Sequence, residues 1–176
     1  IGDPGATINM IRKRPTQNLQ AAFNASYGSW DTQRYEADVS SSLTQDGTIR
    51  GRLFGYQQTG NSYLDRYTLE KNGVGAVVEA DLTDTTLLTT GYTETNHNPN
   101  GVNWGANPLI NTEGEQLSYP RNYNYSPSWT YWDSNIKNYF AKIEQTLGGD
   151  WTAKLAYDER QITRDSKLLF LLGNPG

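Results

Sequence analysis

The side chains best suited to recognising a ligand lie between residues 96 and 134. This segment contains Trp104, Tyr119, Tyr123, Tyr125, Trp129, Tyr131 and Trp132. Flat aromatic faces with amide and guanidinium groups nearby suit a bulky, partly polar ligand. We therefore take Trp104, Asn107, Tyr125 and Trp129 as the candidate ligand-binding residues. The alternative is that these rings only pack on one another inside a long loop, since Trp and Tyr bury well.

Catalytic and metal-binding patterns are weak by comparison. His97 is the only histidine, it stands between Asn96 and Asn98, and the chain has no cysteine. We expect a loop histidine without a metal, because no acidic cluster accompanies it at ligand spacing. Glu36 and Asp38 could serve acid–base chemistry, but no nucleophile and base stand together. The sequence predicts a protein that is not an enzyme and needs no cofactor.

Two groups of charges have a simpler interpretation than catalysis. Glu36 and Asp38 alternate along one predicted strand, and Arg50 and Arg52 alternate along the next. If these strands pair, the four charges can form cross-strand ion pairs on one polar face. The basic run at residues 12–14 could bind an anion or could anchor the N-terminal segment.

The elements that must position these residues are β-strands. Apolar and polar residues alternate with a period of two in seven segments, which indicates half-buried strands. The predicted strands are residues 19–29, 33–43, 49–58, 73–82, 85–95, 136–147 and 151–161. The Asp-Gly pair in "TQDGT" is a strong hairpin signal, and sequential antiparallel hairpins are the simplest topology. The fold class is all-β, an antiparallel meander.

Composition narrows the class of protein. The 176 residues include 12 Tyr and 5 Trp, and the net charge is −4 with scattered signs. This charge argues against a nucleic-acid partner, which would require a basic face. No apolar run is long enough for a transmembrane helix. A transmembrane β-strand is compatible with the sequence, because it requires only alternation over about 10 residues.

The connections between strands favour a membrane barrel. The segments "TQDGT", "DLTDT" and "LGGD" make tight turns, whereas the connections at about 59–73, 96–134 and 161–176 read as long. Short turns at one end and long loops at the other are typical of outer-membrane barrels. Tyr27, Tyr35, Tyr92 and Tyr139 near the long-loop ends, and Trp151 near a short turn, fit aromatic belts at the two interfaces.

The barrel interpretation also predicts which face meets lipid. The residues expected to point outward are Phe23, Val39, Leu53, Val78, Leu88, Ile143 and Leu155. The charged residues at positions 36, 38, 50 and 52 should point inward. An isolated seven-stranded sheet would have two bare edges, so it should aggregate or swap in water. The alternatives are a passive porin-type channel and a soluble carbohydrate-binding β-sandwich, whose strands also alternate.

Several motifs resemble one known family. The run "GDPGATINMIRKRPT" and the following "YGSWDTQRYEADVSSSLTQDGTIRGRLFGY" are similar to the junction of plug and barrel in TonB-dependent ferric-siderophore receptors. The resemblance continues through "NSYLDRY", "TTGYTE" and "NWGANPLINTEG" to "DSKL", and covers essentially the whole chain. Among family members, the chain looks most similar to receptors for ferric hydroxamates of the coprogen and rhodotorulic-acid type.

The resemblance implies a domain organisation. Residues 1–18 would end the plug domain and form the junction, and residues 19–176 would be the N-terminal part of a 22-stranded transmembrane barrel. The segment near 96–134 would be a long extracellular loop. The signal peptide, the TonB box, most of the plug and the remaining strands would lie outside this sequence. The basic run at residues 12–14 would then anchor the plug.

The resemblance also implies function and partners. The protein would sit in the bacterial outer membrane, bind a ferric siderophore and import it with energy from TonB and its inner-membrane complex. TonB would act through a segment N-terminal to this chain, and lipid would surround the barrel. Iron would arrive already bound to the siderophore. Trp104 matches the Trp of the family segment "TWGG", although Ala106 replaces its second glycine.

Overall fold

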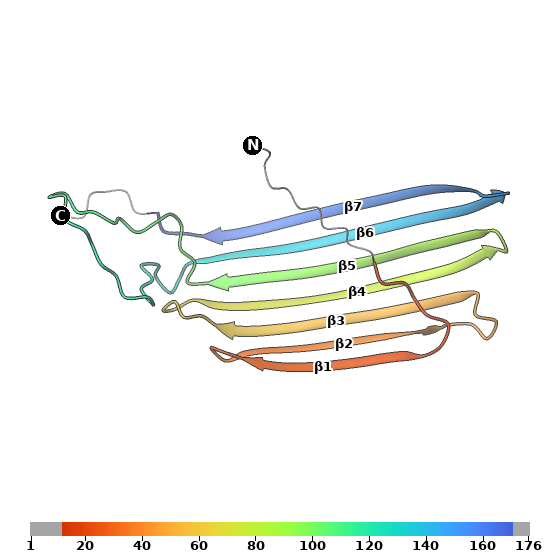
Figure 1. Ribbon diagram of the computed structural model, residues 1–176, viewed down its shortest axis with the longest axis horizontal. Helices are drawn as coiled ribbons and strands as arrows, with labels where there is room; N and C mark the ends of the chain where they lie inside the picture. The colour runs from red at the N-terminus through yellow and green to blue at the C-terminus, as the bar shows by residue number, and fades with distance from the viewer. Residues whose placement is uncertain (1–11, 171–176) are drawn as a thin grey trace.

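The computed structural model describes residues 12–170 as one curved antiparallel sheet (Figure 1). Seven strands follow one another in both sequence and space, each pairing with its immediate neighbours. Their bounds are β1 Gln20–Gly28, β2 Thr32–Ser42, β3 Ile49–Asn61, β4 Thr68–Thr83, β5 Thr86–Asn100, β6 Tyr131–Gly148 and β7 Trp151–Lys167. The predicted meander is confirmed, and the single sheet contradicts a sandwich of two packed sheets.

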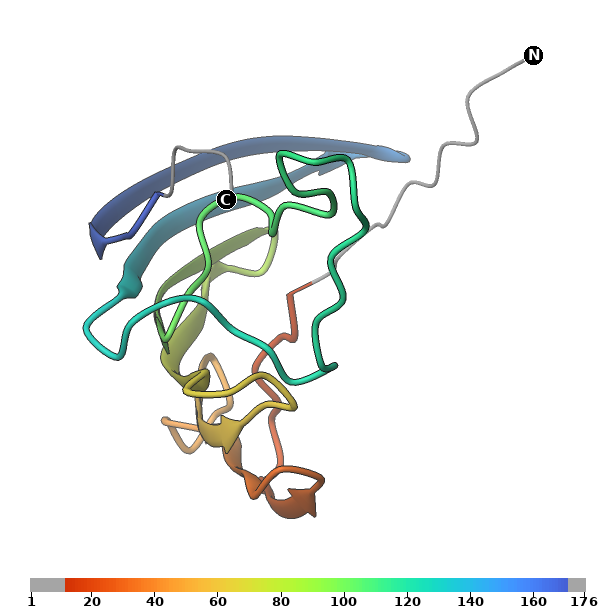
Figure 2. The same ribbon diagram turned by 90° about the vertical axis from the view of Figure 1, so that its left-hand side faces the viewer.

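Figure 2 shows the curvature of this sheet, with residues 12–19 and the connection between β5 and β6 both on its concave side. Within residues 12–170 there is no helix that is long and apolar enough to cross a membrane. In the described sheet, β1 and β7 each pair on one side only. Each therefore presents an open row of backbone groups, which supports further strand pairing.

Strands β3 to β7 are longer than the sequence predicts, mainly at the same end of the sheet, whereas β1 and β2 have about the predicted length. β3 continues to Asn61 and β4 begins at Thr68, so the connection expected at 59–73 is only residues 62–67. Likewise the loop expected at 96–134 is residues 101–130, and β7 continues to Lys167 where a long connection was expected from residue 161. Alternation is lost here because the added residues are mostly polar on both faces, and because β6 begins with two adjacent aromatic residues, Tyr131 and Trp132.

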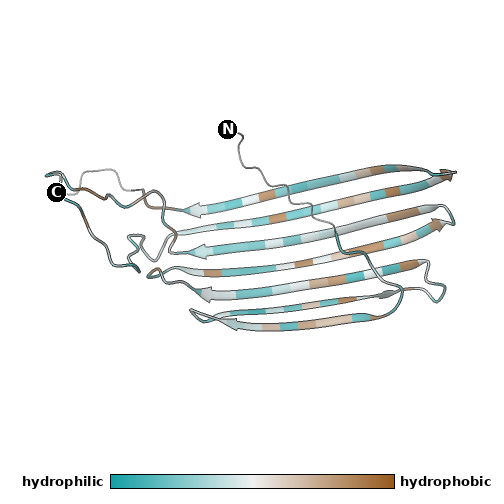
Figure 3. Cartoon of the chain, viewed as in Figure 1, coloured by the Kyte–Doolittle hydropathy of each residue, from teal (hydrophilic) through white to brown (hydrophobic). Residues whose placement is uncertain are grey.

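The two faces of the sheet are assigned as predicted. Opposed residues of an antiparallel pair share a face, and the register opposes Val39 to Leu53, and Ile143 to Leu155. Phe23, Leu53 and Leu155 are largely exposed. The register places them on the face opposite to Asp38, which pairs with Lys13 on the concave side, so they lie on the convex face. Figure 3 shows the brown apolar segments mainly between the middle of the strands and their tight-turn ends. A soluble monomer would not expose such a continuous apolar band, whereas lipid would cover it.

The concave face carries the charges and a little buried apolar surface. Within the part of the chain that the structure describes, the buried hydrophobic residues are Val77 and Phe140. Gly91 lies between them in the register, and a Cβ there would stand 2.5 Å from the Phe140 ring. Because Gly91 has no side chain, the Phe140 ring can lie over β5 on the concave face.

Candidate functional site

Residues 12–18, called here the N-terminal strap, lie across the concave face (Figure 1). The first three are consecutive cations, and each forms an ion pair with a carboxylate on a different strand. The pairs are Arg12–Asp158 on β7 at 2.6 Å, Lys13–Asp38 on β2 at 3.4 Å and Arg14–Glu79 on β4 at 2.6 Å. The structure thus assigns this basic run to ion pairs within the chain.

Arg14 makes the most buried of these contacts. Its Nε and Nη2 donate to the two carboxylate oxygens of Glu79 at 2.6 and 3.1 Å, and the Glu79 side chain is only 2% exposed. Thr89 also donates to this carboxylate, and Arg50 lies 3.8 Å from it. The hydrogen bond that Arg14 donates to Glu79 raises the pKa of Arg14. Removing the carboxylate would leave Arg14 without this partner and close to Arg50, which keeps its own pair with Asp81.

Asp38 links the strap to the neighbouring strand. Arg52 on β3 holds the Asp38 carboxylate at 2.6 and 2.9 Å, and its Nη1 donates to the backbone carbonyl of Arg14 at 3.0 Å. Further along the strap, Thr16 donates from its backbone N–H and its hydroxyl to the buried Ser40. These contacts bind the strap backbone as well as its charged ends.

The predicted cross-strand charge pairs form only in part. Asp38 and Arg52 pair as expected, but Arg50 pairs with Asp81 of β4 at 2.5 Å. Glu36 pairs with Arg34 of its own strand. The register explains the difference, because Arg50 lies opposite Ser42 rather than a carboxylate. The prediction that all four charges face the concave side is confirmed by this shared register.

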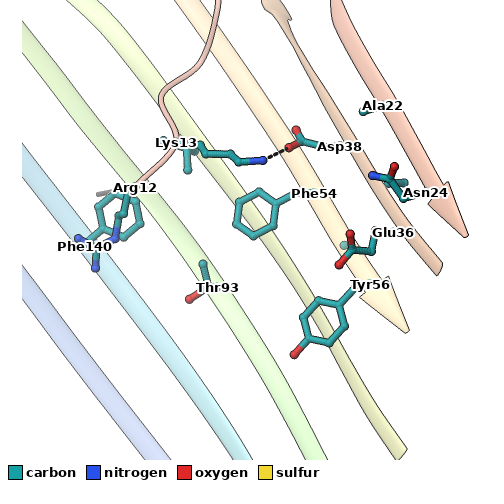
Figure 4. Close-up of a pocket in the computed structure, with 13 residues that line it drawn as sticks. Arg12, Lys13, Ala22, Asn24, Glu36, Asp38, Phe54, Tyr56, Thr93 and Phe140 are labelled. Atoms are coloured by element: carbon teal, nitrogen blue, oxygen red, sulfur yellow. Dashed lines mark hydrogen bonds and ion pairs between the residues drawn. The ribbon is translucent and has the colours of Figure 1, made fainter. Parts of the chain in front are cut away.

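A cavity of about 330 Å³ lies beside the strap (Figure 4). Arg12 and Lys13 line one side of it, and Phe54, Tyr56 and Phe140 supply aromatic surface. The Arg12 guanidinium lies 4.1 Å from the centre of the Phe140 ring, a cation–π contact. The cavity is lined by the strap and by strand residues, not by the aromatic loop. It therefore has room for side chains from other parts of the protein.

The second region is the connection between β5 and β6, residues 101–130, called here the aromatic loop. Its first candidate, Trp104, is 43% exposed and packs against Trp132 of β6, with the ring centroids 5.1 Å apart. The hydroxyl of Tyr125 donates to the backbone carbonyl of Trp104. Trp104 and Tyr125 are therefore brought together, and Trp132 joins them from the strand rather than from the loop.

The other two candidates lie apart from this pair of indole rings. Trp129 is about half exposed and stands beneath the ammonium group of Lys167, which is 5.2 Å from its ring centre. Asn107 is half-buried, three residues after Trp104. Their role in ligand binding stays a prediction.

A second aromatic group, which the sequence analysis did not single out, joins three connections. Trp30 from the β1–β2 turn lies 6.2 Å from Tyr63 of the β3–β4 turn, and the Arg121 guanidinium stands 5.4 Å from the Tyr63 ring. Tyr119 and Tyr123 stack beside Arg121 in the sequence, with centroids 4.7 Å apart. The β3–β4 connection is shorter than the loop expected at 59–73, and only the fold brings it and the β1–β2 turn to the aromatic loop.

His97 is a correction to the sequence analysis. It lies in β5 opposite Lys71 of β4, not in a loop. The polar residues around it, on both faces, concealed the strand. Among residues 12–170, no three His, Cys, Asp or Glu side chains cluster in a way that could hold a metal ion.

Known proteins resemble this chain in sequence and in fold. No protein-family model matches the chain. The chain is 41% identical over 94% of its length to the ferric-pyoverdine 358 receptor of Pseudomonas putida, of which it covers 20%. The chain also superposes on the crystal structure of the ferripyoverdine receptor of the outer membrane of Pseudomonas aeruginosa, which was solved with ferripyoverdine bound. The TM-score is 0.90 and the sequence identity is 30%, over 94% of this chain and 22% of that one.

A receptor for another siderophore has a similar structure. The alcaligin outer-membrane receptor of Bordetella pertussis superposes with a TM-score of 0.69 at 29% identity, over 89% of this chain and 22% of that one. In sequence and in fold, the chain is thus similar to part of several outer-membrane receptors for ferric siderophores. It spans about a fifth of the length of the curated relatives that it matches. These relatives are pyoverdine receptors and do not support the predicted coprogen-type subclass.

Proposed function

We propose that this chain forms part of the wall of an outer-membrane receptor that binds a ferric siderophore and imports it with energy from TonB. The observation that carries the proposal is the packing of Trp104 on Trp132, with Tyr125 bonded to Trp104, at the loop end of a sheet whose convex face is apolar. A related receptor of similar structure was crystallised with ferripyoverdine bound.

The wall assignment fits the two faces of the sheet. The convex face would contact outer-membrane lipid, with Tyr27, Tyr35, Tyr139 and Tyr157 near the outer interface and Trp151 near the inner one. The concave face would line the lumen. Residues 1–18 would end a plug domain, and the ion pairs of the strap would hold that plug against the wall. Residues 101–130 would be extracellular.

The mechanism would be capture followed by a conformational change driven by a partner. Aromatic side chains at the outer end bind the bulky ligand. The strap takes no part in ligand binding and holds the plug against the wall. TonB, acting on a segment N-terminal to this chain, supplies the free energy that binding alone cannot provide, because a ligand shifts an equilibrium only by its differential affinity. Iron is cargo carried by the siderophore.

We propose a pyoverdine-type complex as the ligand. Four pseudomonad relatives that match nearly the whole chain are named for ferric pyoverdine or ferripyoverdine. The fold by itself does not choose the ligand, since the alcaligin receptor shares it. Ferric pyoverdine and ferric coprogen, titrated in parallel, would separate the two classes.

The test is Trp104→Ala in the intact receptor. Loss of an aromatic contact from a desolvated pocket costs about 2 kcal/mol or more at a hot spot, or roughly thirtyfold in affinity. Calorimetric titration of ferric pyoverdine into the purified wild type and variant measures this loss directly. Trp151→Ala is the matched control, because it removes an exposed Trp from the opposite end of the sheet. Equal affinities for wild type and Trp104→Ala would refute the role of Trp104.

A further inference from the structure

The base of the aromatic loop is held by one buried amide. Three separate segments meet there: the β3–β4 turn at residues 62–67, the start of the aromatic loop at Gly101, and its end at residues 124–130. We propose that Asn124 is a positioning residue for ligand capture, which locks these segments together and so fixes the direction of Trp104. This inference rests on the proposed function.

Both polar atoms of the Asn124 side chain are hydrogen-bonded to the backbone. Its Nδ2 donates to the backbone carbonyls of Asp65 at 2.7 Å and Gly101 at 2.8 Å, and its Oδ1 accepts from the backbone N–H of Ser126 at 2.9 Å. The residue is only 2% exposed. A buried amide with both donors and its acceptor satisfied is costly to replace, because each orphaned partner loses its bond without regaining water.

The surrounding backbone is shaped to fit this amide. Gly101 has a φ of 66°, and a Cβ there would lie 2.2 Å from the carbonyl oxygen of Arg66. Arg66, itself at a φ of 63°, donates from Nε to the Ser126 carbonyl at 3.0 Å. Two residues in the left-handed region at one contact indicate a geometry held by its surroundings.

The base connects directly to the binding residues. The Ser126 hydroxyl is paired with the Val102 carbonyl at 2.7 Å and with Oδ1 of Asn103 at 2.6 Å, immediately before Trp104 in the sequence. Tyr125, whose hydroxyl reaches the Trp104 carbonyl, lies between Asn124 and Ser126. A shift of this base would therefore move both candidate aromatic residues at once.

Two substitutions in the intact receptor isolate the amide. Asn124→Ala removes all three bonds, and Asn124→Asp keeps the shape while losing the two donations. We expect each to weaken ferric-pyoverdine binding about tenfold, the effect of orphaning buried carbonyls. Asn122→Ala is the matched control, since its exposed side chain also bridges to this turn, through Oδ1 of Asp65 at 2.9 Å. It should bind within twofold of wild type.

A cross-link distinguishes positioning from direct contact with the ligand. The side chains of Asp65 and Asn122 meet, and the backbone N–H of Asp65 donates to the Asn122 carbonyl at 2.8 Å. An Asp65→Cys/Asn122→Cys pair is therefore positioned to close a disulfide, and mass spectrometry of the oxidised receptor identifies which cysteines have paired. In the Asn124→Ala background, oxidation should restore affinity to within threefold of wild type, and reduction should remove it again.

The outcomes separate this inference from the proposed function. Unchanged affinity of a folded Asn124→Ala receptor, or a loss that the disulfide does not restore, overturns the positioning role. Hydrogen exchange of residues 101–105 provides a readout without ligand and should become about tenfold faster in Asn124→Ala. If Trp104→Ala binds normally while this exchange still accelerates, the ligand assignment fails and the structural lock stands. If the exchange is also unchanged, the lock fails as well.

Discussion

The N-terminal strap and the aromatic loop lie on the same side of the sheet but are held by different chemistry. The strap is fixed by three ion pairs whose cations are each more than half exposed. The base of the loop is fixed mainly by neutral amides, hydroxyls and carbonyls, with the Arg66 guanidinium as a charged donor to backbone carbonyls. Asn124, Ser126 and Thr130 are almost fully buried. Exposed ion pairs are screened by water and salt, whereas buried neutral bonds are not.

This difference matches the tasks that we propose for the two regions. A segment that a partner must displace is better held by contacts that water can replace one at a time. A recognition loop benefits from a rigid base, because ordering it on binding would reduce affinity. The exception within the strap is Arg14, whose carboxylate partner is buried. The strap therefore has two parts. The exposed pairs of Arg12 and Lys13 can separate easily, whereas the pair of Arg14 with Glu79 holds more firmly.

The largest effect is expected at that buried partner. Glu79→Gln keeps the side-chain shape but removes the carboxylate that pairs with Arg14, whereas Arg50 keeps its pair with Asp81. Removal of one partner of a buried pair costs about 3 kcal/mol, so the strap should detach. Trypsin cleavage after Arg12 and Lys13 of the intact receptor measures this detachment, since Pro15 blocks cleavage after Arg14. Glu36→Gln, whose pair with Arg34 stays within β2, is the control. Equal cleavage in both variants would mean that Glu79 does not anchor the strap.

An intermediate effect is expected at the base of the loop. Gly101→Ala combines a left-handed backbone with a Cβ placed 2.2 Å from the Arg66 carbonyl oxygen. Strain of this kind costs about 2 kcal/mol, so exchange in the aromatic loop should accelerate while trypsin cleavage of the strap stays unchanged. Gly114→Ala is a matched control, because that glycine also has a positive φ but no atom within 4 Å of its Cβ position. Similar acceleration in both variants would attribute the effect to backbone strain alone.

The smallest effect is expected at the exposed end of the strap. Lys13 is 74% exposed and lies 3.4 Å from Asp38, which keeps Arg52 as a second partner. Lys13→Ala should raise cleavage after residue 12 by only about threefold, because such pairs contribute at most about 1 kcal/mol. The difference from wild type should shrink in 1 M salt, where the screening length falls to about 3 Å. A salt-independent loss would show that the Lys13 contact is not electrostatic.

Two of the residues that the sequence suggested for ligand binding, Trp104 and Tyr125, lie together in the structure, and their contact with a ligand stays a prediction. The basic run contacts the polar face of the sheet. Trp132 was seen only as another loop aromatic, although it lies in β6 against Trp104. Asn124 was not noticed at all, because a single Asn among many in a polar loop carries no local signal. Its importance appears only when the carbonyls of Asp65 and Gly101 are seen on either side of it.

The sequence by itself determined the strands, their order and the face that each side chain takes, because alternation with a period of two is a local property of the chain. It did not determine where the strands end, since β5 continues through residues that are polar on both faces and β6 begins with aromatic residues on both faces. The contacts of the strap and the loop depend on tertiary structure, because their partners are far apart in sequence. Asn124 and Asp65 are 59 positions apart, Arg14 and Glu79 are 65, and Arg12 and Asp158 are 146. Only the register and curvature of the sheet bring such residues within bonding distance.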